Sequence, residues 1–181
     1  MPKIITDPVT SIQIAAKQIM TDEGYEGLNM RHVAKKSGVA IGTLYNYFEN
    51  KEALVIHLMS NYWDTYFEVI DAVDAKPMSF YEKLSLIYQH FKIFTDDFHE
   101  IFLSQSFRPN YTDKTKANKV NFMLKLQQRF GQMVTQKPDK PASLLSDDEI
   151  AEFILANFVS ITYMPSYSYV KFEKALKAIL G

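Results

Sequence analysis

The chain has 181 residues, a formal net charge of −1, 47% hydrophobic residues, 14% aromatic residues and no cysteine. This length allows one large or two small domains with a sizeable core, and the lack of cysteine excludes disulfides and thiolate metal sites. Residues 1–7 contain no apolar signal region, and no run of 18 uninterrupted apolar residues occurs. We therefore expect a cytoplasmic protein that makes no membrane contact.

The first predicted helix starts at Asp7 and Pro8, a capping acid followed by proline at the first helical position. Apolar residues then recur at steps of three and four, which predicts one buried face. These residues are Ile12, Ala15, Ala16, Ile19 and Met20. We expect Gly24 to end the helix and residues 25–28 to form a loop.

Two short helices joined by a tight turn are predicted over residues 29–48. Asn29 is a suitable N-cap for the first helix, because its side-chain oxygen accepts from free N–H groups of the first turn. Gly38 suits the left-handed position after that helix, and Val39 fixes the turn against the core. This pattern indicates a helix–turn–helix.

The second of these helices is predicted from Ile41 to Phe48. Leu44 and Phe48 are four residues apart and can be buried together, whereas polar and aromatic residues remain on the outer side. The outer residues are Thr43, Asn46 and Tyr47. A helix with such a polar outer face has the form that enters a DNA major groove.

Residues 10–55 resemble the N-terminal domain of the tetracycline-repressor (TetR) family of transcriptional regulators. The matching residues are Ala15, Ala16, Gly24, Val33, Ala34, Gly38, Val39, Gly42, Thr43, Leu44, Tyr45, Tyr47, Phe48, Lys51, Glu52, Ala53 and Leu54. One departure is Ala40, because the family usually has Ser or Thr there to cap the recognition helix. Alanine costs about 1 kcal/mol relative to these caps, so we expect a looser helix until DNA holds it.

The rest of the chain also reads as helical, and no alternation long enough for a strand occurs. Expected helices cover residues 51–73, 97–107, 112–135 and 146–163. Another is expected to start after a cap at Ser79 and to include Phe98, and a last one starts at Pro165. The prediction is an all-α fold with about nine helices. A helix–turn–helix domain would span residues 1–50, and a larger helical domain for ligand binding and dimerisation would span residues 51–181.

The last two predicted helices carry more apolar surface than one side of a helix can bury. The resemblance implies that they pair with their counterparts in a second copy, giving a homodimer. The expected interface residues are Phe153, Leu155, Val159, Tyr163, Phe172, Leu176 and Ile179. The alternative is that both helices only close the core of their own chain.

The resemblance also implies contacts with duplex operator DNA. The expected contact residues are Arg31, Ile41, Gly42, Thr43, Tyr45, Asn46, Tyr47 and Lys51. Tyr45 could equally pack between helices. The whole chain is nearly neutral, but residues 29–51 contain four basic residues and one acidic residue, a local charge of +3. This charge can serve DNA binding where it meets phosphates.

Further, the resemblance implies a small-molecule effector in the helical bundle. Its site would consist of Tyr62, Trp63, Tyr66, Phe91, Phe94, Phe98, Phe102, Phe122 and Phe158, unless these are only core aromatics. Such a lining favours a hydrophobic or flat aromatic ligand. An enzyme is not expected, because the four histidines form no metal or catalytic motif, and we expect no cofactor.

These observations predict a homodimeric regulator that binds a near-palindromic DNA operator. We expect it to be a repressor that a hydrophobic ligand releases from that operator. The alternative from a different class is a helical interaction or ligand-sequestering module that does not bind DNA. Its support is the slight local charge and Ala40.

Overall fold

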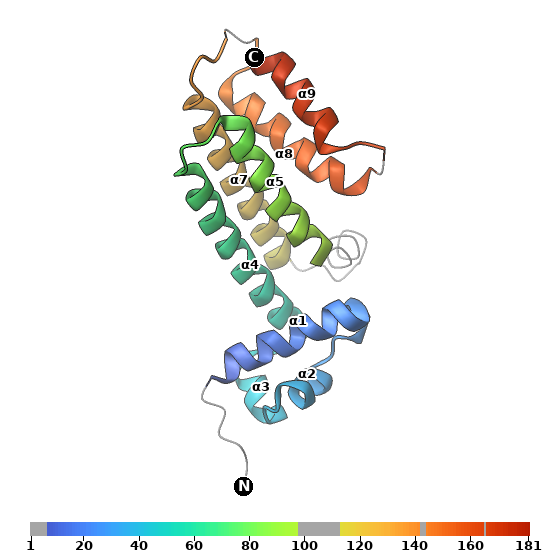
Figure 1. Cartoon of the computed structure of the whole chain (residues 1–181). Coiled ribbons are helices and arrows are strands. Elements are labelled where there is room, and N and C mark those ends of the chain that lie inside the picture. Colours follow the sequence, from blue (N-terminus) through green and yellow to red (C-terminus); the bar gives the residue numbers. More distant parts are fainter. Residues whose placement is uncertain (1–6, 98–112, 142–143, 165) are drawn as a thin grey trace. The chain divides into compact units, whose positions relative to one another are not determined.

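The structure is a computed structural model that describes residues 7–97, 113–141, 144–164 and 166–181. These residues form eight helices and no strand, so the all-α prediction is confirmed for them (Figure 1). The helices are α1 (Pro8–Gly27), α2 (Met30–Ser37), α3 (Ile41–Tyr47), α4 (Lys51–Asp74), α5 (Phe80–Asp97), α7 (Asp113–Thr135), α8 (Asp147–Tyr163) and α9 (Tyr169–Leu180). The helix expected at 97–107 falls almost wholly outside the described residues.

The chain divides into two compact units, with residues 7–62 in the first and residues 63–96 and 113–181 in the second. Helix α4 contributes its residues 51–62 to the first unit and 63–74 to the second. The first unit holds α1, α2, α3 and the start of α4. The second unit holds the rest of α4, all of α5 except its last residue, and the helices α7, α8 and α9.

Helix α1 begins as predicted, because the Asp7 carboxylate accepts a hydrogen bond from the N–H of Thr10 at 3.0 Å. The hydrogen bonds from Thr10 hold the pKa of Asp7 below its ordinary value. The helical path is interrupted at Gly24 as predicted, because its φ of 71° and ψ of −179° are open almost only to glycine. The loop expected at residues 25–28 is wrong over residues 25–27, which continue α1 beyond this kink to Gly27.

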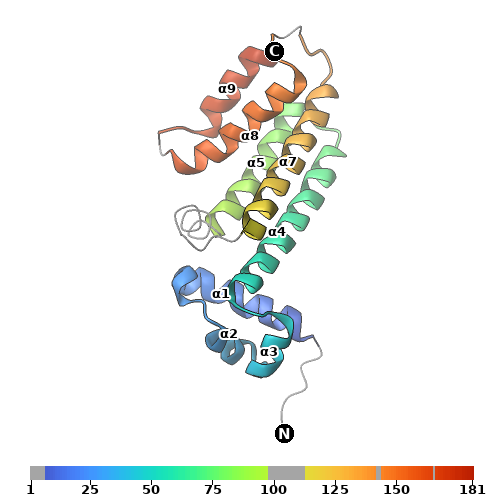
Figure 2. The same ribbon diagram turned by 180° about the vertical axis from the view of Figure 1, so that it is seen from behind.

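Packing of α7 against α8 dominates the second unit, and both views show α8 and α9 side by side (Figure 2). Helix α8 starts with the predicted capping box: Ser146 accepts from the N–H of Glu149, and the Glu149 carboxylate accepts from the N–H of Ser146. Helix α9 starts at Tyr169, so the prediction of a start at Pro165 is wrong. A turn closed by the N–H of Tyr167 and the carbonyl of Met164 delays the helix.

Candidate nucleic-acid interface

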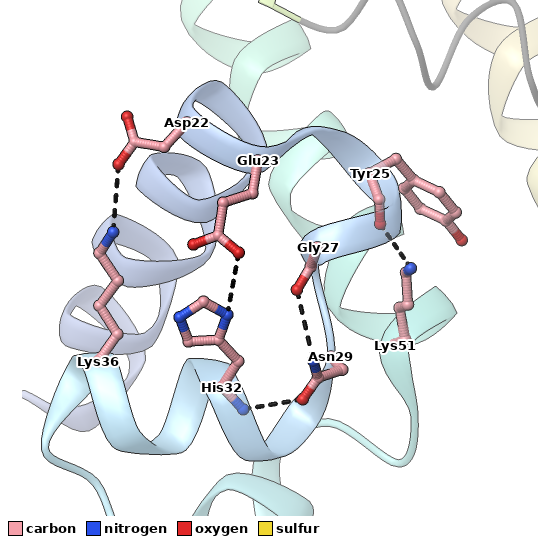
Figure 3. A network of polar contacts seen from close by, with 8 residues as sticks. All are labelled: Asp22, Glu23, Tyr25, Gly27, Asn29, His32, Lys36 and Lys51. Atoms are coloured by element: carbon pink, nitrogen blue, oxygen red, sulfur yellow. Dashed lines mark hydrogen bonds and ion pairs between the residues drawn. The ribbon is translucent and has the colours of Figure 1, made fainter.

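Helix α2 is fixed at both ends by the residues predicted from the sequence. The side-chain oxygen of Asn29 accepts a hydrogen bond from the N–H of His32 at 2.9 Å (Figure 3). Gly38 takes the left-handed conformation with φ 71° and ψ 7°, and Val39 is buried directly after it. This turn aims the chain into α3.

Helix α3 is held by burial and not by a side-chain cap. Ala40 supplies no capping hydrogen bond, in agreement with the sequence. Leu44 is fully buried and Phe48 is nearly so, as their spacing predicted. A helix of two turns is unstable alone, so these two anchors decide its position.

The opposite side of α3 is open to solvent. Tyr45 and Tyr47 are each 50% exposed and Ile41 is 41% exposed, while Thr43 is half-buried. Gly42 and Asn46 are also exposed. Tyr45 therefore lies at the surface and does not pack between helices. A Cβ added at Gly42 would meet no atom of the chain within 4 Å, so the backbone there can be approached closely.

Positive charge near α3 comes from α2. Arg31 and Lys35 are exposed. Lys36 is exposed as well, but it forms an ion pair with Asp22 of α1 at 3.3 Å, and His32 lies 3.5 Å from the carboxylate of Glu23 (Figure 3). Arg31 and Lys35 are therefore the better candidates for phosphate contact on α2.

Lys51 has a contact that the sequence did not suggest. Its ammonium group donates to the carbonyl oxygen of Tyr25 at 2.6 Å and lies 3.7 Å from the centroid of that ring. This is a cation–π contact as well as a hydrogen bond. Lys51 thus ties the start of α4 to the end of α1 (Figure 3).

Two further polar contacts connect α1 to α4 in the first unit. Gln13 Nε2 lies 2.6 Å from His57 Nε2, and the ammonium of Lys17 donates to the Tyr62 hydroxyl at 2.6 Å. Gln13 and Lys17 are four residues apart and share one side of α1. In the sequence, this spacing is the only feature that points to these contacts. Tyr62 was instead predicted to belong to the effector site.

The other predicted effector residues within the described chain form a buried aromatic cluster in the second unit. The cluster consists of Trp63, Tyr66, Phe91, Phe94, Phe122 and Phe158. Trp63 stacks on Phe122 with 4.6 Å between centroids, and Phe91 lies 5.8 Å from Phe158. Phe98 and Phe102 lie outside the described residues.

Two polar atoms of this cluster differ in their surroundings. The Tyr66 hydroxyl donates to the carbonyl of Ile87 at 3.0 Å, and burial raises its pKa. The indole N–H of Trp63 is buried without an acceptor among the described residues. An unmatched buried donor costs about 1–3 kcal/mol, which favours any ligand that supplies an acceptor.

The predicted interface residues of α8 and α9 fall into two groups. Phe172 and Leu176 are fully buried against the core of their own chain, because α9 packs its apolar face on α8. They are not on the surface. Phe153, Leu155, Val159 and Ile179 are half-buried, and Tyr163 is 40% exposed. This second group is accessible to a partner.

A groove of about 380 Å³ lies between α4 and α7 in the second unit. All but one of its lining residues have polar or charged side chains; they are Asp64, Phe67, Glu68, Asp71, Lys125, Gln128, Arg129 and Gln132. Arg129 and Asp71 bridge it with an ion pair at 3.1 Å. The predicted aromatic residues do not line this groove.

The family model "Bacterial regulatory proteins, tetR family" matches residues 13–58, which include α2, α3 and the start of α4. Solved structures with the same fold include a TetR regulatory protein from Rhodobacter sphaeroides, with a TM-score of 0.71 and 16% identity over 95% of this chain and 98% of that one. The predicted resemblance to the TetR family is thus confirmed for residues 13–58.

Other proteins similar to this chain are also named as regulators. The fatty acid metabolism regulator protein of Bacillus subtilis is 29% identical over 61% of this chain and 57% of its own length. The transcriptional repressor KstR of Mycolicibacterium smegmatis is 43% identical over 32% of this chain and 26% of its own length. The alignments thus span little more than half of these relatives at most.

A structure of FadR from Bacillus subtilis in complex with stearoyl-CoA has a TM-score of 0.69 to this chain, with 20% identity over 95% of this chain and 97% of that one. This likeness shows a shared fold. In the described part of the chain, no helix is long and apolar enough to cross a membrane. No group of three or more His, Asp or Glu residues is placed to hold a metal ion among those same residues.

Proposed function

We propose that this chain is a DNA-binding transcriptional repressor that acts as a homodimer on a near-palindromic operator and is released by a small hydrophobic ligand. Residues 1–50 serve DNA binding, and residues 51–181 serve ligand binding and dimerisation. The observation that carries the proposal is α3, which turns its apolar side inward and leaves Tyr45, Asn46 and Tyr47 exposed.

A homodimer suits such a small reading surface. One α3 has only seven residues, so a single copy covers few base pairs. Two copies entering successive major grooves about 34 Å apart would read twice as many base pairs. The accessible apolar residues Leu155, Val159 and Tyr163 on α8 support pairing through the last two helices.

The proposed ligand is hydrophobic because the second unit has an aromatic core and few buried polar groups. The relative named as a fatty acid metabolism regulator and the FadR structure with stearoyl-CoA make a long-chain acyl-CoA the first compound to test. Trp63 is the only tryptophan of the chain and lies in the aromatic cluster. Its fluorescence therefore reports directly on binding in the second unit.

A gel-shift titration on the chain's own promoter tests DNA binding. Thr43→Ala combined with Tyr47→Ala is expected to weaken binding strongly, whereas Val170→Ala on α9 should leave it unchanged. Equal affinity of the double variant and the unchanged protein would contradict the proposal.

The salt dependence of DNA binding tests which basic residues contact phosphates. Removal of one cation that binds a phosphate lowers the slope of log affinity against log salt by about 0.9. We expect this change for Arg31→Ala on all sequences. Lys36→Ala should change the slope little, because its ammonium is paired with Asp22.

Ligand release is tested with stearoyl-CoA and, as the matched control, CoA without the acyl chain. Stearoyl-CoA should change Trp63 emission and lower DNA affinity by about 5- to 150-fold, the usual range of such coupling. If emission and DNA affinity both stay constant, this class of ligand is wrong, although DNA binding itself would stand.

A further inference from the structure

The exposed side of α3 carries few kinds of side chain. Between Ile41 and Tyr47 there is no charged residue. The exposed residues offer one apolar branched side chain from Ile41, one carboxamide from Asn46 and two phenol groups from Tyr45 and Tyr47. Asn46 is thus the only amide, and no guanidinium or ammonium group comes from α3 itself.

The cations of the neighbouring helices α2 and α4 lie outside α3, and two of them are engaged inside the chain. Lys36 is paired with Asp22, and Lys51 is bonded to the carbonyl of Tyr25. Arg31 and Lys35 are exposed but belong to α2. Helix α3 therefore carries no donor of the kind that most often reads guanine, which is Arg or Lys on the O6 and N7 atoms.

From this inventory we propose that α3 reads A·T base pairs, with Asn46 bonded to the N6 and N7 edge of an adenine and Ile41 against the methyl group of a thymine. Asparagine pairs with adenine through two hydrogen bonds, and apolar side chains contact the thymine methyl. Any guanine contact must come from residues outside α3. The inference rests on the proposed function and names the operator class for the same surface.

The open surface at Gly42 agrees with this reading. Ile41 and Gly42 are adjacent in the first turn of α3, and a Cβ at Gly42 would project into open space. A bare backbone at this point lets α3 lie deep in the major groove. Depth is needed here because the Asn46 and Ile41 side chains are short and must reach base edges directly.

The first experiment selects duplexes from a library with a randomised core of about 30 base pairs, enough for two half-sites one helical turn apart, using the full chain. The expected result is a two-fold-related consensus whose half-sites each contain a block of A·T pairs, with any G·C pairs outside it. Failure to enrich any duplex would overturn the inference together with DNA binding. Enrichment of half-sites built on G·C pairs would overturn the inference alone.

The second experiment replaces each thymine of the selected duplex in turn by deoxyuridine, which removes only the methyl group. One such replacement per half-site should lower the affinity of the unchanged protein by about fourfold, the value of one buried methyl. The Ile41→Ala variant should not respond to that replacement. Ile14→Ala, the same change at an exposed residue of α1, should respond like the unchanged protein.

The third experiment addresses Asn46 in the same manner, with 7-deazaadenine in place of each adenine to remove the N7 acceptor. We expect one sensitive adenine per half-site and no such sensitivity in Asn46→Ala. The Asn46→Ala variant should itself bind about 5- to 150-fold more weakly. If no adenine or thymine replacement affects the unchanged protein, α3 does not read A·T pairs, whatever the folding of the variants.

Discussion

The ring of Phe48, the residue that follows α3, packs against the imidazole of His57 on α4, with 5.2 Å between the ring centroids. His57 also contacts Gln13 of α1 through Nε2 at 2.6 Å. One side chain therefore touches both the anchor of the recognition helix and the first helix. In this way the start of α4 sets the position of α3 within the first unit.

Replacing His57 by alanine should destabilise the first unit by about 1–3 kcal/mol. This change combines an aromatic contact of about 0.5–1.5 kcal/mol with a hydrogen bond of similar size. DNA affinity should fall as well, because Phe48 is then without its support. Urea unfolding and gel shift measure the two effects. His90→Ala, at an exposed position of α5, is the control and should change neither.

Two glycines of the first unit should respond in opposite ways to alanine. Gly24 has φ 71° and ψ −179°, so Gly24→Ala should cost about 1–3 kcal/mol of unfolding free energy. Gly42→Ala should raise stability by up to about 1 kcal/mol, because alanine favours a helix and meets no atom there. Its DNA affinity should nevertheless decrease. A Gly42→Ala protein with unchanged affinity would show that DNA does not approach this backbone closely.

Phe158 should be the most sensitive position of the second unit. Its side chain is fully buried and lies within 5.1–6.4 Å, between ring centroids, of the rings of Tyr88, Phe91, Phe130, Tyr169 and Phe172. Phe158→Ala should cost about 3–5 kcal/mol, since a cavity of this kind cannot collapse fully. Calorimetry measures the change. Val170→Ala on α9, where the side chain is exposed, should stay within about 0.5 kcal/mol.

The capping box of α8 should give a measurable dependence of stability on pH. Hydrogen bonds from the backbone and side chain of Ser146 hold the pKa of Glu149 below its ordinary value of 4.5. This stabilisation is complete above the unfolded pKa and is lost as pH falls through the folded pKa. Glu149→Gln should therefore be less stable than the unchanged protein at pH 7.

That difference should shrink as the solution is made more acidic than pH 4.5. Asp148→Asn, in the same turn but outside the capping box, is the matched control and should show a weaker trend. Thermal unfolding at a series of pH values compares the three proteins. A constant gap between Glu149→Gln and the unchanged protein over the whole series would refute the assignment.

Local signals predicted most helix ends correctly, because each depends on a few adjacent residues. Asn29, Gly38 and Ser146 act as the sequence indicated. The two errors arose where turn geometry overrode a local signal. Residues 25–27 are helical beyond the break at Gly24, where a loop was expected, and the turn at Tyr167 moves the start of α9 to Tyr169.

The candidate DNA-binding surface was less completely predicted. The hydrophobic periodicity separated the buried residues Leu44 and Phe48 from the outer residues of α3. It did not decide whether Tyr45 is exposed or packs between helices, and it did not show that Lys51 is bonded to Tyr25. That bond joins residues 26 positions apart. No periodic pattern encodes it, since it depends on where α1 and α4 meet.

The sequence alone determined the helical class and the helix–turn–helix, because capping residues and hydrophobic spacing act over a few positions. The tertiary structure decided which cations of α2 and α4 are paired within the chain and which apolar residues of α8 and α9 stay accessible. Burial and ion pairing depend on neighbours distant in the chain, and only the packed helices bring those neighbours together.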